Sequence, residues 1–380
     1  MAESAELKQW LAEWPAVRAS VDELVLSLKR RKVSGSYETA RKTMSLFNTM
    51  LETVDWTTAG EILEKVRQLG DMLTKAHTHE LVIGNVVRRV LYIIREEHSN
   101  ALKMTGSSAS SAVVSGPPSS RSNNLSRSLG TILAPGTDTD LSIPIADLKL
   151  SVMEGIAELT DEIESLHVSI AEQAMEYIHT DEVILTFGMS ASVEQFLKTA
   201  AKKRQFKVIV VESAPALNGQ KMAHSLAEHG IHAIVIPDSA IFAMMARVNK
   251  VLLPATAVVA NGGLIGQSGL QNIALAAKKC SVPVVCVAGL IKLCPLYVHE
   301  LDVLSELMAP SNVFNYDDTV ENIWRLVHVC LLQLEVLNPA YDYVPPECVS
   351  LFITNTGAHQ PSYIYRLLAE YYSPQDNQLS

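Results

Sequence analysis

Apolar residues recur every three or four positions through the first hundred residues, over 5–30 and 36–100. This spacing places them on one face of a helix. The apolar face of AGEILEKVRQLGDML, for example, holds Ile62, Val66 and Leu69. No strand-like alternation of any length interrupts the pattern. We therefore expect an N-terminal helical domain over residues 1–104.

The next segment has a different composition. Residues 105–128 contain ten serines and almost no large apolar side chain. Such a stretch buries too little apolar surface to offset its ordering entropy, so we expect a disordered loop over 105–145. The helical pattern returns at 146–180, where apolar residues keep a three-or-four spacing, and predicts a long linking helix.

From residue 181 the pattern changes to short apolar runs separated by segments of helical length. The runs are EVILTF (182–187), KVIVVE (207–212), HAIVIP (232–237), KVLLPATAVV (250–259), PVVCVA (283–288) and LFITNTG (351–357). The last run follows an expected turn at YDYVPPE. Nearly continuous apolar strands that alternate with helices indicate a parallel sheet covered on both faces. The fold class is therefore α/β: a helical domain followed by a Rossmann-like parallel-sheet domain over 181–380.

Ligands of such sheets bind beyond the carboxyl ends of the strands. The turns expected there are 188–192, 212–219, 238–241, 256–270 and 289–295. Chemistry on a sugar phosphate needs a cation for the phosphate and an acid–base pair for proton transfer. FGMSAS and ATAVVANGG supply neither, while Glu212 and Asp238 are isolated carboxylates. Lys250 precedes its strand and so lies at the opposite edge.

The stretch VVANGGLIGQSGLQNIAL (258–275) reads as a glycine-rich turn between a strand and a helix. It lacks both the G-x-G-x-x-G order of dinucleotide folds and the Lys-Ser/Thr ending of a P-loop. Backbone amides at the helix start could still hold an anion. The alternative is a tight turn whose backbone needs positive φ. We favour the turn.

Composition narrows the functional classes. The 380 residues are 48% hydrophobic and 19% charged, with a formal net charge of −10, which fits two or three folded domains. This charge argues against bulk attraction to nucleic acid or to an anionic membrane. The first residues resemble no signal peptide, and no apolar stretch is long enough to span a bilayer. We expect a cytoplasmic protein.

Metal and cofactor chemistry is not indicated. Five cysteines without a C-x-x-C pair suggest free thiols in a reducing compartment. Cys280, Cys286 and Cys294 are too irregularly spaced for a zinc site, and Cys286 lies within an expected strand. The histidines that cluster near the end of an expected helix need not converge: His224, His229 and His232. We expect no catalytic residue, cofactor or metal.

The pair Arg88–Arg89 within NVVRRVL is open to several interpretations. The two arginines could form a docking patch for a partner. A solvated helix face or an interior ion pair is equally compatible with the pattern.

Five longer segments resemble the regulatory subunits of eukaryotic translation initiation factor 2B. They are GNVVRRVLYIIREE (84–97), EVILTFGMSASVEQFLK (182–198), VIVVESAPALNGQKMAHSLAEHGI (208–231), VLLPATAVVANGGLIGQSGLQNIALAAK (251–278) and NPAYDYVPPECVSLFITNTGAHQPSYIYRLLAE (338–370). Their order matches along nearly the whole chain apart from the serine-rich segment. The ending DYVPPE…PSYIYRLL and the run VNKV…VANG are most similar to the beta type.

The same superfamily includes isomerases that act on methylthioribose-1-phosphate and ribose-1,5-bisphosphate. The resemblance places their catalytic cysteine at Gly188 and their catalytic aspartate at Thr256. Their Asn-Lys pair falls on Gly266-Gln267, and one of their arginines falls on Ala214. Glycine and threonine cannot form the acid–base pair that the isomerisation needs. The resemblance therefore implies an isomerase scaffold without its catalytic groups.

The resemblance implies a non-catalytic regulatory subunit of the guanine-nucleotide exchange complex for translation initiation factor 2. The implied partners are delta-like and alpha-like regulatory subunits, gamma and epsilon subunits that carry the exchange activity, and initiation factor 2 through its alpha subunit. The regulatory core would help to sense phosphorylation of that alpha subunit, as in the integrated stress response. Neither nucleic acid nor membrane is an implied partner.

Within this interpretation, the obligate subunit interface is expected on the sheet domain and its C-terminal segment. The candidate interface residues are His179, Tyr363, Ile364 and Tyr365, with Arg88 and Arg89 as candidates for contact with initiation factor 2. Packing on the chain's own core is an equally plausible role for the aromatic residues. An active isomerase and a metabolite-binding module remain alternatives, and ligand protection and turnover assays separate them.

Overall fold

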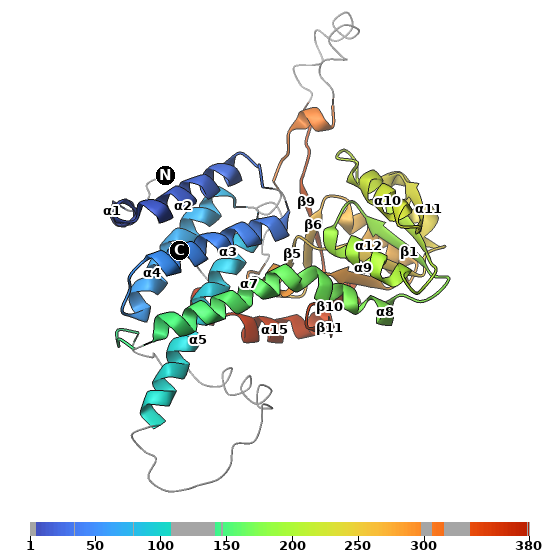
Figure 1. The fold of residues 1–380 in the computed structure, drawn as a ribbon. Coiled ribbons are helices and arrows are strands. Elements are labelled where there is room, and N and C mark those ends of the chain that lie inside the picture. Colours follow the sequence, from blue (N-terminus) through green and yellow to red (C-terminus); the bar gives the residue numbers. More distant parts are fainter. Residues whose placement is uncertain are drawn as a thin grey trace, which may run out of the picture. The chain divides into compact units, whose positions relative to one another are not determined.

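The computed structural model describes residues 5–33, 35–78, 80–107, 141–145, 147–297, 306–314, 335–377 and 379 (Figure 1). It confirms the expected fold class, with a helical N-terminal region followed by a mostly parallel sheet flanked by helices. The expected disordered loop at 105–145 lies largely outside the described residues. Among the described residues, no helix is both long and apolar enough to cross a membrane.

The described chain divides into two compact units. The first, which we call the helical unit, comprises residues 1–165, 291–296 and 365–380. The second, which we call the sheet unit, comprises residues 166–290 and 297–364. This division differs from the expected ranges, because the C-terminal segment groups with the N-terminal helices rather than with the sheet.

The helical unit is built from amphipathic helices, as the apolar spacing predicted. They are α1 (Ala5–Glu13), α2 (Pro15–Lys29), α3 (Ser36–Thr53), α4 (Ala59–Ala76) and α5 (Leu81–Ser107). The Oγ1 atom of Thr58 caps α4 by accepting from the backbone N–H of Glu61 at 3.4 Å. Helices α4 and α5 approach closely because Gly70 has no side chain: a Cβ there would lie 2.4 Å from Cγ1 of Val87. The apolar faces of these helices form the core of the unit.

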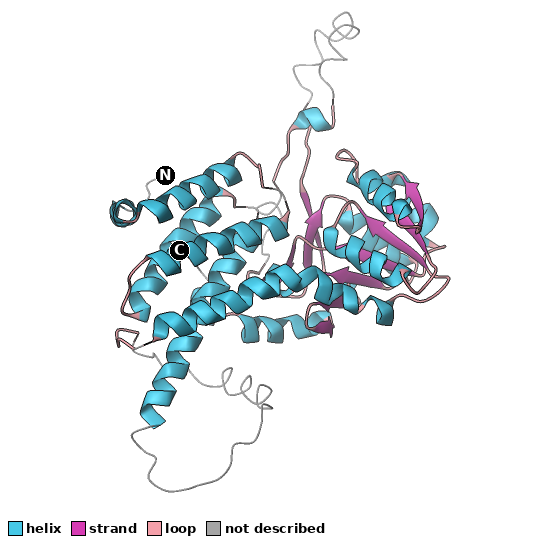
Figure 2. Ribbon diagram, viewed as in Figure 1, coloured by secondary structure: helices cyan, strands magenta, loops and turns pink. Residues whose placement is uncertain are grey.

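The predicted linking helix is α7 (Leu148–Glu172), followed by the short α8 (Ala174–Tyr177). The chain then forms the larger sheet, in the order β11-β10-β7-β4-β1-β2-β3. Figure 2 draws the strands in magenta and the helices in cyan. The strands of the larger sheet are β1 (Val183–Phe187), β2 (Lys207–Val211), β3 (His232–Ile236), β4 (Lys250–Pro254), β7 (Val284–Val287), β10 (Leu351–Thr354) and β11 (Gly357–His359). Only the β10–β11 pair is antiparallel.

Helices join the parallel strands of this sheet. They are α9 (Ala191–Ala201), α10 (Asn218–Glu228), α11 (Ile241–Met245) and α12 (Leu270–Lys279). The central strands β1, β4 and β7 are buried along most of their length, whereas the edge strand β3 is buried only at Ile236. This burial explains why the central strands read as continuous apolar runs.

Three expectations for the sheet unit were wrong in detail. The run 250–259 forms two strands, because β5 (Ala257–Val259) leaves the larger sheet after β4. The stretch 258–275 is a hairpin rather than a single turn: β5 turns back at 260–263 into β6 (Leu264–Gln267), and α12 begins three residues later. The segment YDYV, expected as a turn, is β9 (Tyr341–Val344) and pairs antiparallel with β6.

The chain ends in the helical unit. Helix α15 (Ile364–Tyr371) lies at the boundary of the two units, and its residues from Tyr365 onward group with the helical unit. The two-residue strand β8 (Leu293–Cys294) belongs to the same unit.

Candidate functional site

The carboxyl end of β1 is followed by Gly188, where we expected the counterpart of the isomerase cysteine. Its φ of +58° lies in the left-handed region that favours glycine. A Cβ at this position would lie 3.0 Å from Oε1 of Gln267 and 3.5 Å from Oγ of Ser213. The structure therefore brings Gly188 and Gln267 together at the carboxyl edge of the sheet, with a serine that the sequence analysis did not single out.

The turn after β2 holds Ser213 and Ala214, and a carboxylate satisfies its backbone. Asp238, at the end of β3, accepts from the backbone N–H of Ser213 at 3.2 Å and of Ala214 at 2.7 Å. The sequence showed Asp238 as an isolated carboxylate, but its role as acceptor for the neighbouring turn depends on the pairing of β2 with β3. These two N–H groups are therefore already paired with an anionic group of the chain itself.

Thr256, where we expected the counterpart of the isomerase aspartate, follows β4. Its backbone N–H donates to the carbonyl of Ile265 in β6 at 2.9 Å, so Thr256 forms part of the hairpin framework. Gly266 lies within β6, where a Cβ would meet Cδ2 of Leu270 at 2.5 Å. The absence of a side chain at Gly266 thus lets the start of α12 pack against β6.

The hairpin turn itself is held by side chains. Oδ1 of Asn261 accepts from the N–H of Gly263 at 2.8 Å, and its amide donates to the hydroxyl of Tyr343 at 2.8 Å. Gly262 has φ +79°, and a Cβ there would lie 2.6 Å from the carbonyl oxygen of Pro361. The glycines of this stretch therefore meet a backbone requirement, as the favoured interpretation proposed.

The start of α12 is the place where backbone amides could hold an anion. There the carboxylate Oδ2 of Asp342, on β9, accepts from the N–H of Gly269 at 2.7 Å. A carboxylate near a helix N-terminus is stabilised by the helix dipole. Asp342 therefore already binds this N–H group, a contact that no sequence pattern indicated because YDYV was expected as a turn.

Two buried hydroxyls at this edge remain unsatisfied. Ser213 is fully buried and Thr186 is 1% exposed, and among the described residues neither hydroxyl oxygen has a hydrogen-bond partner. A serine or threonine hydroxyl can orient a water or a neutral group, but without a neighbouring base it is a poor general base at neutral pH. Most of the groups that this edge offers are neutral donors and acceptors, and the carboxylates of Asp238 and Asp342 are engaged by backbone N–H groups.

Arg88, a candidate for contact with initiation factor 2, lies inside the helical unit with 5% exposure. Its Nε and Nη2 atoms donate to the carbonyl of Asn377 at 3.2 Å, and Nη1 donates to Oδ1 of Asn85 at 3.3 Å. Its neighbour Arg89 is half-buried and donates to the carbonyl of Tyr371 at 3.1 Å. Both arginines are thus engaged by the chain's own C-terminal segment.

The other interface candidates differ in exposure. His179 is exposed, and its Nδ1 lies 2.8 Å from Nη1 of Arg204. Tyr363 is half-buried and stacks on His359 with ring centroids 5.1 Å apart. Ile364 is fully buried, whereas Tyr365 is 61% exposed. Of the three consecutive candidates, only Tyr365 presents most of its side chain to a partner.

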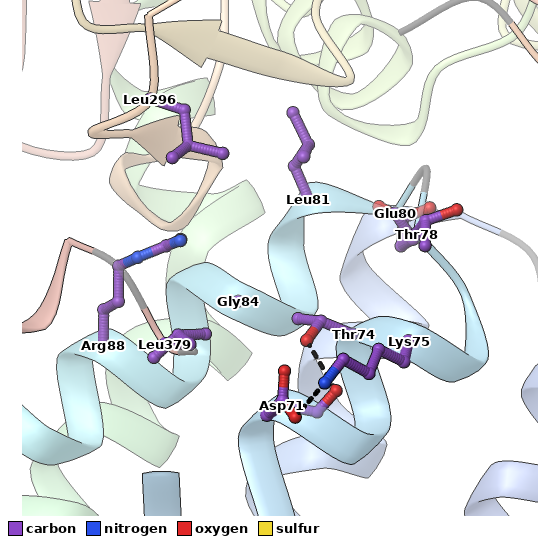
Figure 3. A pocket seen from close by; sticks show the side chains of 10 residues that line it. All are labelled: Asp71, Thr74, Lys75, Thr78, Glu80, Leu81, Gly84, Arg88, Leu296 and Leu379. Atoms are coloured by element: carbon purple, nitrogen blue, oxygen red, sulfur yellow. Dashed lines mark hydrogen bonds and ion pairs between the residues drawn. The ribbon is translucent and has the colours of Figure 1, made fainter. Parts of the chain in front are cut away.

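A cavity of about 220 Å³ lies in the helical unit, away from any expected site residue except Arg88 (Figure 3). Its polar lining includes Arg88, Glu80 and the ion pair between Lys75 and Asp71. Burial raises the pKa of Glu80, while Ser36 and Lys292 act in the opposite direction. Groups that could hold a metal ion do not cluster anywhere among the described residues.

The comparisons with known proteins agree on one family. The model of the initiation factor 2 subunit family matches residues 32–361. A translation initiation factor eIF2B subunit beta from Dictyostelium discoideum is 41% identical over 381 residues, covering 93% of this chain and 95% of the relative. The eIF2B subunit beta of Schizosaccharomyces pombe is 35% identical over 392 residues, covering 94% and 96%.

A solved structure extends this likeness to the fold. A chain in the crystal structure of the tetrameric eIF2B-beta2-delta2 complex from C. thermophilum is similar with a TM-score of 0.67 and 27% sequence identity, over 98% of this chain and all of that chain. The family model, the whole-length relatives and the fold all agree. The chain therefore belongs to the initiation factor 2 subunit family.

Proposed function

We propose that this chain is the beta-type regulatory subunit of the guanine-nucleotide exchange complex for translation initiation factor 2, acting in the cytoplasm. The observation that carries the proposal is the similarity to beta subunits along nearly the full length of both chains. Its role would be to scaffold the complex and to help sense phosphorylation of the alpha subunit of initiation factor 2.

The carboxyl edge of the sheet supports a non-catalytic role. Gly188 and Thr256 occupy the positions where related isomerases use a cysteine and an aspartate. Gln267 and Ala214 occupy positions where those enzymes use a lysine and an arginine. Without these groups the edge has no acid–base pair for an isomerisation. The exchange activity of the complex would then belong to gamma-like and epsilon-like subunits.

A delta-like subunit is the proposed direct partner, by analogy with the beta2-delta2 tetramer to which the fold is similar. We place this interface on the sheet unit and the adjoining Tyr365, with His179 and Tyr363 as contributors. Ile364 would act by packing, since it is buried. We do not place Arg88 or Arg89 in a direct contact with initiation factor 2, because their guanidinium groups hold the C-terminal segment.

Co-expression with a delta-like subunit, followed by native mass spectrometry, tests the proposal. We expect a stable hetero-oligomer of the two chains, to which an alpha-like subunit and initiation factor 2 bind. The proposal would be overturned if the chain remained a monomer when it was co-expressed with each of these partners. Tyr365→Ala should weaken the hetero-oligomer, and Leu150→Ala, at a 64% exposed position of α7, is a matched surface control.

The non-catalytic part of the proposal has its own test. The purified chain should neither isomerise a ribose phosphate nor melt at a higher temperature in its presence. Turnover would show an active isomerase. Thermal protection without turnover would instead show a metabolite-binding module, with the unsatisfied hydroxyls of Ser213 and Thr186 as its first candidate contacts.

A further inference from the structure

The C-terminal segment returns to the N-terminal helices after the sheet unit is complete. Residues 365–380 group with the helical unit, although up to about 300 residues of chain separate them from α4 and α5. We call the described part, residues 365–377, the C-terminal strap. Figure 1 marks the C-terminus beside the N-terminal helices of this unit. Its contacts with α4 and α5 are ionic, polar and apolar.

A buried carboxylate forms the ionic part. Asp376 is fully buried, and its Oδ1 accepts from Nη2 of Arg67 on α4 at 2.8 Å. Its Oδ2 accepts from Nε of Arg95 on α5 at 2.8 Å, and Nη2 of Arg95 reaches Oδ1 at 3.1 Å. Arg95 therefore binds the carboxylate in the bidentate geometry, which is the strongest form of this pair. One carboxylate joins two helices to the end of the chain.

Two further arginines of α5 hold the backbone of the same segment. Arg88 donates twice to the carbonyl of Asn377, and Arg89 donates to the carbonyl of Tyr371. The guanidinium carbon of Arg89 also lies 4.1 Å from the ring centroid of Tyr371, within cation–π range. Because Arg88 and Arg95 are seven residues apart, they lie on one face of α5.

The apolar part completes the core of the helical unit. Tyr372 is 2% exposed, and its hydroxyl donates to the carbonyl of Leu293 at 2.8 Å. Leu367 and Leu368 are 8% and 6% exposed. Burial raises the pKa of Tyr371 and of Tyr372 well above the ordinary tyrosine value, so both hydroxyls stay protonated at physiological pH.

The apolar and the ionic contacts of the strap differ in how strictly they fix its register. The apolar side chains would favour burial of the strap in any register, whereas the carboxylate of Asp376 fixes one register against α4 and α5. Without it, the guanidinium group of Arg95 would lose its buried anionic partner, and Arg67 would keep only a 4.0 Å contact with the exposed Glu64, which is unfavourable. The stability of the strap in this register therefore depends mainly on one residue near its C-terminal end, Asp376.

We propose that the C-terminal strap is a releasable element that closes the helical unit, and that Asp376 is its latch. With the latch intact, the strap exchanges its amide hydrogens only with the opening of the whole unit. With the latch removed, residues 371–377 open by themselves while α3 and the β strands stay closed. This is local unfolding of a segment whose anchor has been lost.

Hydrogen–deuterium exchange on the full chain, alone or bound to its partner subunit, tests the latch. Asp376→Asn keeps the size of the side chain and removes its charge, and we expect amide exchange in 371–377 to become at least tenfold faster. Glu370→Gln is the matched control, because Glu370 pairs with Arg366 on the exposed face of α15. It should leave exchange in 371–377 unchanged.

A second variant keeps the test decisive if Asp376→Asn does not fold. Arg67→Gln removes one of the two guanidinium partners and leaves the bidentate contact of Arg95. It should accelerate exchange in 371–377 less than Asp376→Asn does, and the two effects should not add in the double variant. Equal exchange in wild type, Arg67→Gln and Glu370→Gln would overturn the proposal, as would uniform acceleration throughout the helical unit.

Discussion

The carboxyl edge of the sheet and the arginine-rich face of α4 and α5 use charge differently. At the sheet edge, Asp238 and Asp342 accept from backbone N–H groups, and the neutral residues Gly188, Ser213 and Gln267 lie close together. On the helical unit, arginines are abundant, yet they hold Asp376 and backbone carbonyls of the same chain. In both regions the charged groups that could serve a ligand are used to hold the fold together. The difference is that the sheet edge relies on glycine geometry, whereas the helical unit relies on a buried ion cluster.

Removal of the latch carboxylate should give the largest effect. Asp376→Ala leaves two guanidinium groups partly buried without their anion, and breaking a buried ion pair in this way costs about 3–5 kcal/mol. We expect the free energy of unfolding of the helical unit, measured by urea denaturation of the full chain, to fall by this amount. A loss below about 1 kcal/mol would show that the ion cluster is no more important than a surface pair.

The glycine geometry of the hairpin should give the next largest effect. Gly262→Ala places a Cβ at 2.6 Å from the carbonyl oxygen of Pro361, at a residue with φ +79°. The backbone strain alone costs about 1–2 kcal/mol, and the close contact adds to it. Gly230→Ala is the control, because its φ is +77° and nothing lies within 4 Å of the added Cβ. The melting temperature of Gly262→Ala should be well below that of Gly230→Ala. Equal melting temperatures would show that the contact with the carbonyl oxygen of Pro361 does not matter.

The carboxylate at the start of α12 should matter less. Asp342→Asn keeps an oxygen that can accept from Gly269 but removes the charge that the helix dipole favours. We expect a loss of about 1 kcal/mol in chemical denaturation, with the added prediction that inorganic phosphate does not restore it. Restoration by phosphate would mean that the helix start is an open anion site.

Glu80 should give the smallest effect, with a size that depends on pH. Its Oε1 atom has no hydrogen-bond partner among the described residues, and burial raises its pKa above the ordinary value of 4.5. Because the pKa of Glu80 is higher in the folded state than in the unfolded state, protonation of Glu80 favours the folded state. This contribution to the free energy of unfolding is fully present below pH 4.5 and is lost as pH rises through the raised pKa. Glu80→Gln should therefore be more stable than wild type at pH 7, by less than about 1 kcal/mol, and the gain should vanish near pH 4. A pH-independent difference would contradict this.

The sequence predicted the helical character of the N-terminal region and the bounds of most strands of the larger sheet, because each depends on a local period. The apolar spacing located α4 and α5, and the continuous apolar runs located β1, β2, β3 and β7. It missed β6 and β9, whose residues read as turns. Gly263 and Gly266 suggested a loop, yet β6 is a strand because it pairs with β5 on one side and β9 on the other.

Arg88 shows the same limit for a candidate site residue. The sequence left a docking patch, a solvated face and an interior ion pair open. The structure places Arg88 inside the helical unit, where its partners are Asn85 and the carbonyl of Asn377. The second of these lies 289 residues away, and no local pattern reports such a contact.

The sequence by itself determined most of the described helices and strands and the family that the chain resembles. These follow from side-chain period and residue type, which are local properties. Only the tertiary structure decided that Asp342 satisfies the start of α12, that Ser213 faces Gly188, and that Asp376 closes the helical unit. Each of these joins residues that are far apart in the chain, and chain folding alone brings such groups within hydrogen-bond distance.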